Sequence, residues 1–258
     1  MTLKEENIKE LNKEFYFVFS EYSTLARKFT VLAEQLSNDR AKEFTRHGFV
    51  RRLKLLKACI DTIYNICPPD IDRKLTDEEL ASVTINLHAF YIHTYGIFDN
   101  LAFIWVKERQ IEKKNGESFK DREIGLMKDH ILATFPDDLK KYLKDKSKWF
   151  ENLNNFRHSL AHRISPYVPP YQIKPEDKEV YNNLATLSSE ALNKSDTEEY
   201  NRLTKKMSDL GVFSPIITHS FSEKSAIVLF QPQILADWKT IIEISNYFLE
   251  AMKMDYKI

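Results

Sequence analysis

The residues best suited to chemistry in this chain form one short run, Arg157-His158-Ser159-Leu160-Ala161-His162. An arginine guanidinium can hold a phosphate through its fork of N–H donors, and an imidazole can take up or release a proton near neutral pH. On a helix from about Ser147 to Ile164, His158 and His162 are one turn apart and lie on the same side, in a polar strip that also contains Asn154. The run therefore predicts proton transfer beside a bound phosphate.

The apolar face of the same helix predicts the position of the arginine. Apolar side chains at helical spacing form one arc, with Arg157 at its margin: Trp149, Phe150, Leu153, Phe156, Leu160 and Ile164. A half-buried arginine is costly unless a carboxylate, a carbonyl or a phosphate accepts its donors. Asp99 and Asn100 interrupt the most apolar helix of the chain, where an unpaired carboxylate is costly. We therefore expect Asp99 or Asn100 to approach Arg157 or one of the histidines.

The arrangement of Arg157, the polar His158 and His162 resembles the Arg-polar-x-x-x-His motif of the HEPN superfamily, a group of all-α bundles. The likeness extends to a preceding apolar helix with an internal acidic or amide residue, and to the proline-rich exit at 165–171. It covers residues 81–170. By chance, the bare motif is expected about 0.3 times in a chain of this composition, so the surrounding helices carry much of the resemblance.

The resemblance implies metal-independent cleavage of RNA in a cleft shared by two protomers of a homodimer. Arg157 would hold the phosphate and His162 would take the proton from a ribose 2′-hydroxyl, with His158 as a second proton donor or an orienting group. The supporting residues would be Asp99, Asn100 and Asn154. A role in bacterial stress or defence, of the toxin or abortive-infection type, would follow, with an antitoxin or another protein as a partner and no cofactor or metal.

Three other interpretations use the same residues. The chain could be a HEPN-like binding or interaction module without catalysis. His158 and His162, at i and i+4, could instead chelate zinc, with a third ligand from His88, His93 or Asp99, although no HExxH motif accompanies them. The histidines could also merely solvate a helix edge while Arg157 pairs with a carboxylate.

The composition limits the partners and the classes of function. Among 258 residues, 38 are Lys or Arg and 38 are Asp or Glu, so no net positive field attracts nucleic acid, and any RNA contact must be local. A basic stretch from Arg46 to Lys57, which includes Arg51 and Arg52, is explained at least as well by a solvated helix face. None of the five glycines forms a phosphate-cradling GxGxxG or GxxxxGK[ST] loop, which argues against a nucleotide-dependent kinase or ATPase.

The expected cellular location depends on signal, cysteine and membrane-span patterns in the sequence. No secretory signal pattern opens it, and two cysteines are too few for a disulfide framework. The uncharged stretch from Leu80 to Phe98 is long enough to cross a bilayer, but polar residues such as Asn86 and His88 favour a buried helix. We expect a cytoplasmic protein without a membrane partner.

The hydrophobic pattern predicts an all-α bundle of long antiparallel helices, folded as a single domain over residues 1–258. Helices are expected over about 8–36, 39–66, 76–105, 121–134 and 147–164, with a last helix from about 232. Residues 176–211 are predicted to form a peripheral helical insertion, because their apolar stripe is weak. Residues 214–231 read as a small β-hairpin, because two β-branched runs flank a polar turn.

Overall fold

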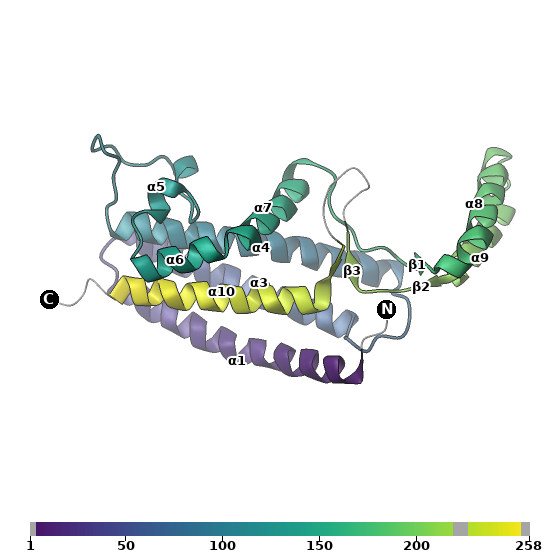
Figure 1. The fold of residues 1–258 in the computed structure, drawn as a ribbon, viewed down its shortest axis with the longest axis horizontal. Helices are drawn as coiled ribbons and strands as arrows, with labels where there is room; N and C mark the ends of the chain where they lie inside the picture. Colours follow the sequence, from purple (N-terminus) through teal and green to yellow (C-terminus); the bar gives the residue numbers. More distant parts are fainter. Residues whose placement is uncertain (1–3, 219–226, 254–258) are drawn as a thin grey trace.

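The first helix establishes the long axis of the bundle. The computed structural model describes residues 4–218 and 227–253, and within them α1 spans Glu5–Gln35. Its seam buries Val18, Leu25, Phe29 and Leu32, which follow one another at helical spacing. The last helix, α10 (Phe230–Lys253), runs along α1 and contacts it (Figure 1). The predicted all-α bundle of long helices is confirmed.

The predicted second helix is continuous but contains an irregular turn. Asn38 caps α2 (Asp39–Glu43) by accepting hydrogen bonds from two backbone N–H groups, and a π-helical segment, η1 (Phe44–Val50), leads into α3 (Arg51–Ile66). The chain leaves the helix at Cys67, directly before the two prolines, as expected. The π-helical segment was not predicted, because its residues keep a helical polarity pattern.

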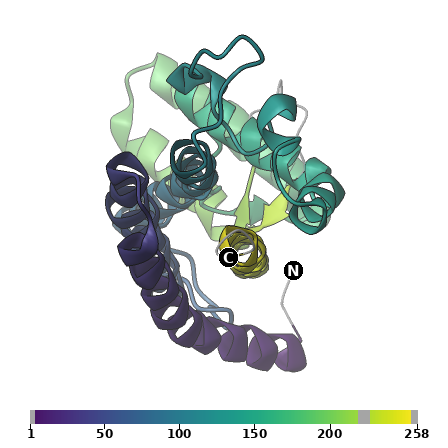
Figure 2. The same ribbon diagram turned by 90° about the vertical axis from the view of Figure 1, so that its left-hand side faces the viewer.

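The most apolar helix lies in the middle of the bundle, as predicted. α4 (Asp77–Glu108) begins with a capping box, in which the Thr76 hydroxyl accepts from the Glu79 N–H and the Glu79 side chain accepts from the Thr76 N–H. It packs along α3 and also contacts η1, α7 and α10 (Figure 2). No helix in the described ranges is both long and apolar enough to span a bilayer.

The prediction of one helix over 121–134 is wrong. The chain instead forms a short 3₁₀ turn, η2 (Asp121–Glu123), an extended step, and one turn of helix, α5 (Asp129–Leu132). Ile124 is buried in extended backbone, and Leu126 is buried in the turn that follows, in which the Lys128 N–H donates to the Gly125 carbonyl. Pro136 then precedes α6 (Asp137–Asp145), a helix that was not predicted.

The helix that carries the motif, α7 (Ser147–His162), is confirmed, although it ends two residues earlier than expected. Two ring contacts fix it on α4: Phe156 stacks on Tyr91 at 4.3 Å between centroids, and Phe150 meets Phe98 edge to face at 5.2 Å. α7 is therefore held along its length by the central helix.

The C-terminal third contains two small antiparallel sheets. β3 (Ile216–Ile217) pairs with β4 (Val228–Leu229), which confirms the predicted hairpin, although its connecting residues lie outside the described ranges. The other sheet, β1 (Gln172–Ile173) with β2 (Gly211–Val212), was not predicted because two-residue strands show no period.

A helical pair separates the strands of that second sheet. Residues 176–211, predicted as a peripheral insertion, contain α8 (Lys178–Asn193) and α9 (Thr197–Asp209), preceded by a short 3₁₀ turn, η3 (Pro175–Asp177). α8 and α9 pack mainly on each other and extend away from the long helices (Figure 1). The candidate site therefore depends on α4, α7 and the segment between them.

Candidate functional site

The polar face of α7 presents the motif residues toward solvent. His158 and His162 are exposed, and their rings are 5.0 Å apart between centroids at an interplanar angle of 68°. Arg157 is half-buried, with its guanidinium carbon 4.7 Å from the centre of the Tyr95 ring on α4. In the described part of the chain, no carboxylate or carbonyl forms a hydrogen bond with this guanidinium or with either imidazole. These donors and acceptors are therefore available to a ligand.

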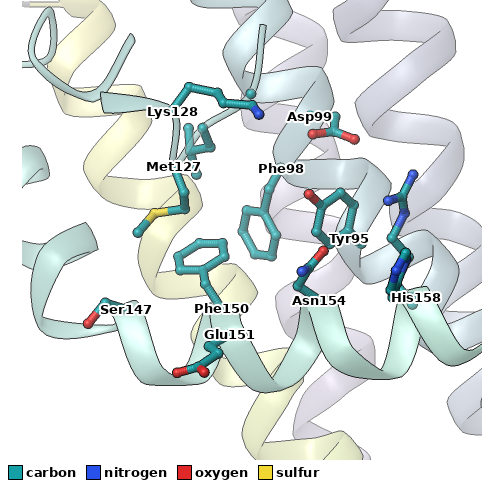
Figure 3. A pocket seen from close by; sticks show the side chains of 13 residues that line it. Tyr95, Phe98, Asp99, Met127, Lys128, Ser147, Phe150, Glu151, Asn154 and His158 are labelled. Atoms are coloured by element: carbon teal, nitrogen blue, oxygen red, sulfur yellow. The ribbon is translucent and has the colours of Figure 1, made fainter. Parts of the chain in front are cut away.

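A cavity of about 570 Å³ opens beside this face, between α4, α7 and the segment Gly125–Lys128 (Figure 3). Arg157, His158 and Asn154 of α7 line it, together with Asp99 of α4. Four of the six predicted site residues thus share one cavity. His162 does not line it and lies one turn further along α7.

Asp99 contributes negative charge to the cavity wall. Burial raises the pKa of its carboxyl to about 6, although the nearby positive charges of Arg157, Arg52 and Lys128 each oppose the shift. Within the described ranges Asp99 forms no ion pair with Arg157, so the two groups interact through the field across the cavity rather than through a hydrogen bond. Asp99 and Arg157 therefore share a site without neutralising each other by direct contact.

Asn100 is not part of this cavity. Its amide oxygen accepts a hydrogen bond from Nε of Arg52 at 3.0 Å, and Nη1 of Arg52 lies 3.1 Å from Nδ1 of His93. Burial lowers the pKa of His93, and the charge of Arg52 lowers it further. The supporting role predicted for Asn100 beside Arg157 is thus replaced by a contact with a different arginine, on the α3 side of α4.

The sequence analysis assigned Arg52 to a solvated helix face and missed its contacts with α4, for which a signal was present. A Cβ on Gly96 would lie 2.5 Å from the Arg52 guanidinium carbon, and a Cβ on Gly48 would lie 2.8 Å from the Asn100 amide carbon. Glycine inside a helix costs stability and often marks a close approach of another group. These two helical glycines therefore indicated the half-buried polar network of Arg52, Asn100 and His93.

The remaining residues of the cavity wall had no comparable signal. Lys128 and Met127 come from a stretch predicted as helix, and Phe98 and Phe150 matched an ordinary core pattern. Their convergence depends on the extended step before α5, which no local pattern revealed.

Among the residues that the structure describes, the alternative zinc site has no third ligand. Nε2 of His88 is 2.7 Å from the carbonyl oxygen of Pro166, and His93 is engaged with Arg52. In residues 4–218 and 227–253, no three His, Cys, Asp or Glu side chains gather closely enough to hold a metal ion. The i, i+4 pair His158 and His162 therefore has no further ligand of the kind a zinc site needs within these ranges.

Comparison with known proteins adds no family to these observations. The chain matches no protein-family model, and no significantly similar curated protein or solved structure was found. A functional assignment therefore depends on the side chains of α7 and the cavity beside them.

Proposed function

We propose that this chain is a HEPN-like, metal-independent endoribonuclease that acts with Arg157, His158 and His162. The observation that carries the proposal is the position of Arg157. Its guanidinium lies over the Tyr95 ring and in the field of Asp99. Its N–H donors have no hydrogen-bond partner among the described residues. A guanidinium oriented in this way can bind a phosphodiester in two-point geometry. Two exposed imidazoles, with ring centroids 5.0 Å apart, lie on the same helix face and supply groups that can act as acid and base.

The chemistry needs only groups on α7. His162 takes the proton from a ribose 2′-hydroxyl, the 2′-oxygen attacks the adjacent phosphorus, and the bond from phosphorus to the 5′-oxygen breaks. His158 gives a proton to the departing 5′-oxygen. The products are a 2′,3′-cyclic phosphate and a 5′-hydroxyl, and Arg157 stabilises the charge that grows on the phosphate oxygens.

The biological setting belongs to the same proposal. Two protomers would bring their α7 helices together in a homodimer, so that the exposed imidazoles face a shared cleft. The partners would be RNA and an antitoxin or another protein, in a cytoplasmic stress or defence system of the toxin or abortive-infection type. Because the formal net charge is zero, RNA would be held by the local groups of the cleft rather than by a general field.

The test is cleavage of a DNA strand that contains a single ribonucleotide, in the presence of EDTA. We expect cleavage at the ribonucleotide alone, because the 2′-hydroxyl is the nucleophile. Arg157→Ala and His162→Ala should each lower the rate by about 100-fold or more, as expected for loss of a transition-state donor or a general base. Circular dichroism should show that both variants remain folded, because both side chains lie at the surface or its margin.

Matched controls come from exposed residues of the same types away from α7. Arg51→Ala, on the first turn of α3, and His47→Ala, on η1, should leave the rate unchanged. Cleavage that survives both α7 substitutions would refute the catalytic assignment. Binding of RNA without cleavage by the wild-type chain would instead favour the interaction module, the alternative that the neutral net charge supports.

A further inference from the structure

Asp99 lies close to the place where Arg157 would hold an anion. The two side chains line the same cavity, Asp99 from α4 and Arg157 from α7, and no hydrogen bond joins them in the part of the chain that the structure describes. Asp99 is half-buried. It lies in the fields of three cations, which are Arg157, Arg52 and Lys128. One carboxylate therefore faces positive charges that come from α7, from α3 and from the segment before α5.

Lys128 approaches this carboxylate from the segment Gly125–Lys128. A Cβ on Gly125 would lie 3.8 Å from Oδ1 of Asp99 and 3.9 Å from Cε of Lys128. Figure 3 shows the lysine side chain extending toward the Asp99 carboxylate. Because Nε and Nη1 of Arg52 are engaged with the fold, Arg157 and Lys128 are the two cations of this group that can hold an anion in the cavity.

An anion between Arg157 and Lys128 would bring a second negative charge beside Asp99. Two anions that share a half-buried site cannot both keep their charge at little cost, and the weaker acid takes up a proton. A phosphodiester is far more acidic than a carboxyl group, so the proton would go to Asp99. Burial has already raised the pKa of this carboxyl to about 6, so protonation near neutral pH requires little additional free energy. The protonated carboxyl can then donate its O–H to a phosphate oxygen.

We infer that the cavity binds a phosphate group together with one proton from solvent, that Asp99 takes up this proton, and that Lys128 holds the phosphate jointly with Arg157. This inference rests on the proposed ribonuclease function and adds a pH dependence to substrate binding. Asp99 serves binding, and it takes no part in proton transfer to or from the 2′- and 5′-oxygens.

The other titratable groups at the cavity determine the design of the test. His158 lines it and His162 lies one turn away, and an imidazole can gain a proton between pH 5 and 8. Both are exposed, so a background variant that carries His158→Gln and His162→Gln removes their titration without disturbing the fold. Burial and the charge of Asp99 raise the pKa of Tyr95, which therefore stays neutral in this range. Glu151 is an exposed carboxylate that lines the same cavity, and it supplies the matched control.

The experiment compares the background variant with the same chain carrying Asp99→Asn or Glu151→Gln. The probe is a 2′-fluoro RNA hexamer, which has no 2′-hydroxyl and keeps its backbone charge from pH 6 to pH 8, and sulfate is the second probe. Fluorescence anisotropy would measure the hexamer affinity at pH 6, 7 and 8. Calorimetry in two buffers of different ionisation enthalpy would count the protons taken up with each probe.

We expect the background variant to bind the hexamer about tenfold more weakly at pH 8 than at pH 6, with uptake of about half a proton or more at pH 7. The affinity falls as the pH rises, because an ionised Asp99 must first gain its proton. Asp99→Asn should bind tightly at every pH without proton uptake. Glu151→Gln should keep both the pH dependence and the proton. Lys128→Ala should weaken binding at every pH, whereas Lys114→Ala, exposed and outside the cavity, should not.

The outcomes separate the inference from the proposed function, because cleavage is measured on the wild-type chain. Affinity that is independent of pH, a pH dependence that survives Asp99→Asn, or failure of both probes to bind overturns the inference, whether or not the wild type cleaves RNA. Proton uptake that requires Asp99, in a chain whose wild type does not cleave, supports the inference and overturns the ribonuclease. Uptake with sulfate but no binding of the hexamer assigns the site to a free anion and overturns the RNA-binding part of the inference.

Discussion

Asp237 on α10 connects this helix to α7, and its buried carboxylate lowers the free energy of unfolding at neutral pH. Its Oδ1 accepts hydrogen bonds from Nε1 of Trp149 at 2.8 Å and from Nε2 of Gln233 at 2.7 Å. Its burial raises the pKa of the carboxyl from the ordinary 3.8 to about 6, although both hydrogen bonds oppose the shift. The substitution Asp237→Asn keeps an oxygen at the same place, so it preserves both hydrogen bonds while removing the charge.

The sign and size of the effect follow from proton linkage. Because the folded state binds this proton more tightly than the unfolded state, stability falls as the pH rises from about 4 to about 6, and the full penalty remains above that range. The difference between 3.8 and about 6 corresponds to about 3 kcal/mol at pH 7.5, and to about 1 kcal/mol at pH 4.5. The new amide N–H₂ group costs about 1 kcal/mol or more if it is unpaired, at either pH.

Urea unfolding followed by circular dichroism at pH 4.5 and pH 7.5 would test this reasoning. The difference in free energy of unfolding, Asp237→Asn minus wild type, should rise by about 2 kcal/mol from pH 4.5 to pH 7.5. Asp99 titrates in the same range, but it is present in both proteins and cancels in the difference. A difference that is equal at both pH values would refute the assignment of a raised pKa to Asp237.

Two further substitutions test the elements that position the site. Gly96→Ala should destabilise the fold by about 1–3 kcal/mol, because the new methyl group displaces the Arg52 guanidinium from its hydrogen-bond partners. This loss exceeds the stability that alanine's higher helix propensity adds. In an Arg52→Met background the same change should be neutral or stabilising, and urea unfolding of the double-mutant cycle measures the reversal. Thr76→Ala should cost about 1 kcal/mol by removing the capping box of α4, whereas Thr76→Ser should cost little, as thermal unfolding would show.

The long helices could be predicted because their seams are long. α1 and α4 each repeat apolar residues over many turns, so the period is unambiguous, and Thr76 with Glu79 marks the start of α4. The segment from 121 to 134 was predicted wrongly, because Ile124 and Leu126 are buried around Gly125 in extended backbone and a turn, which have no helical period. Strands of two residues, such as β1 and β2, carry no period at all.

The candidate site was predictable where it lies on one helix. The relation among Asn154, Arg157 and His158 follows from helical geometry alone, so their shared face could be read from the sequence. The partner on α4 could not be settled in this way, because consecutive residues point about 100° apart and either Asp99 or Asn100 could face α7. Asp99 faces the cavity, and Asn100 points toward α3.

Two arginines near the same carboxylate show why the proposed function depends on Arg157. The field of Asp99 acts on both Arg52 and Arg157. Arg52 contacts Asn100 through Nε and His93 through Nη1, between packed helices, so two of its nitrogens are engaged with the fold. Arg157 has the ring of Tyr95 and a cavity instead, an arrangement that orients a guanidinium without occupying its donors. The donors that Arg157 leaves open on the cavity side are the ones that the proposed function assigns to a phosphate.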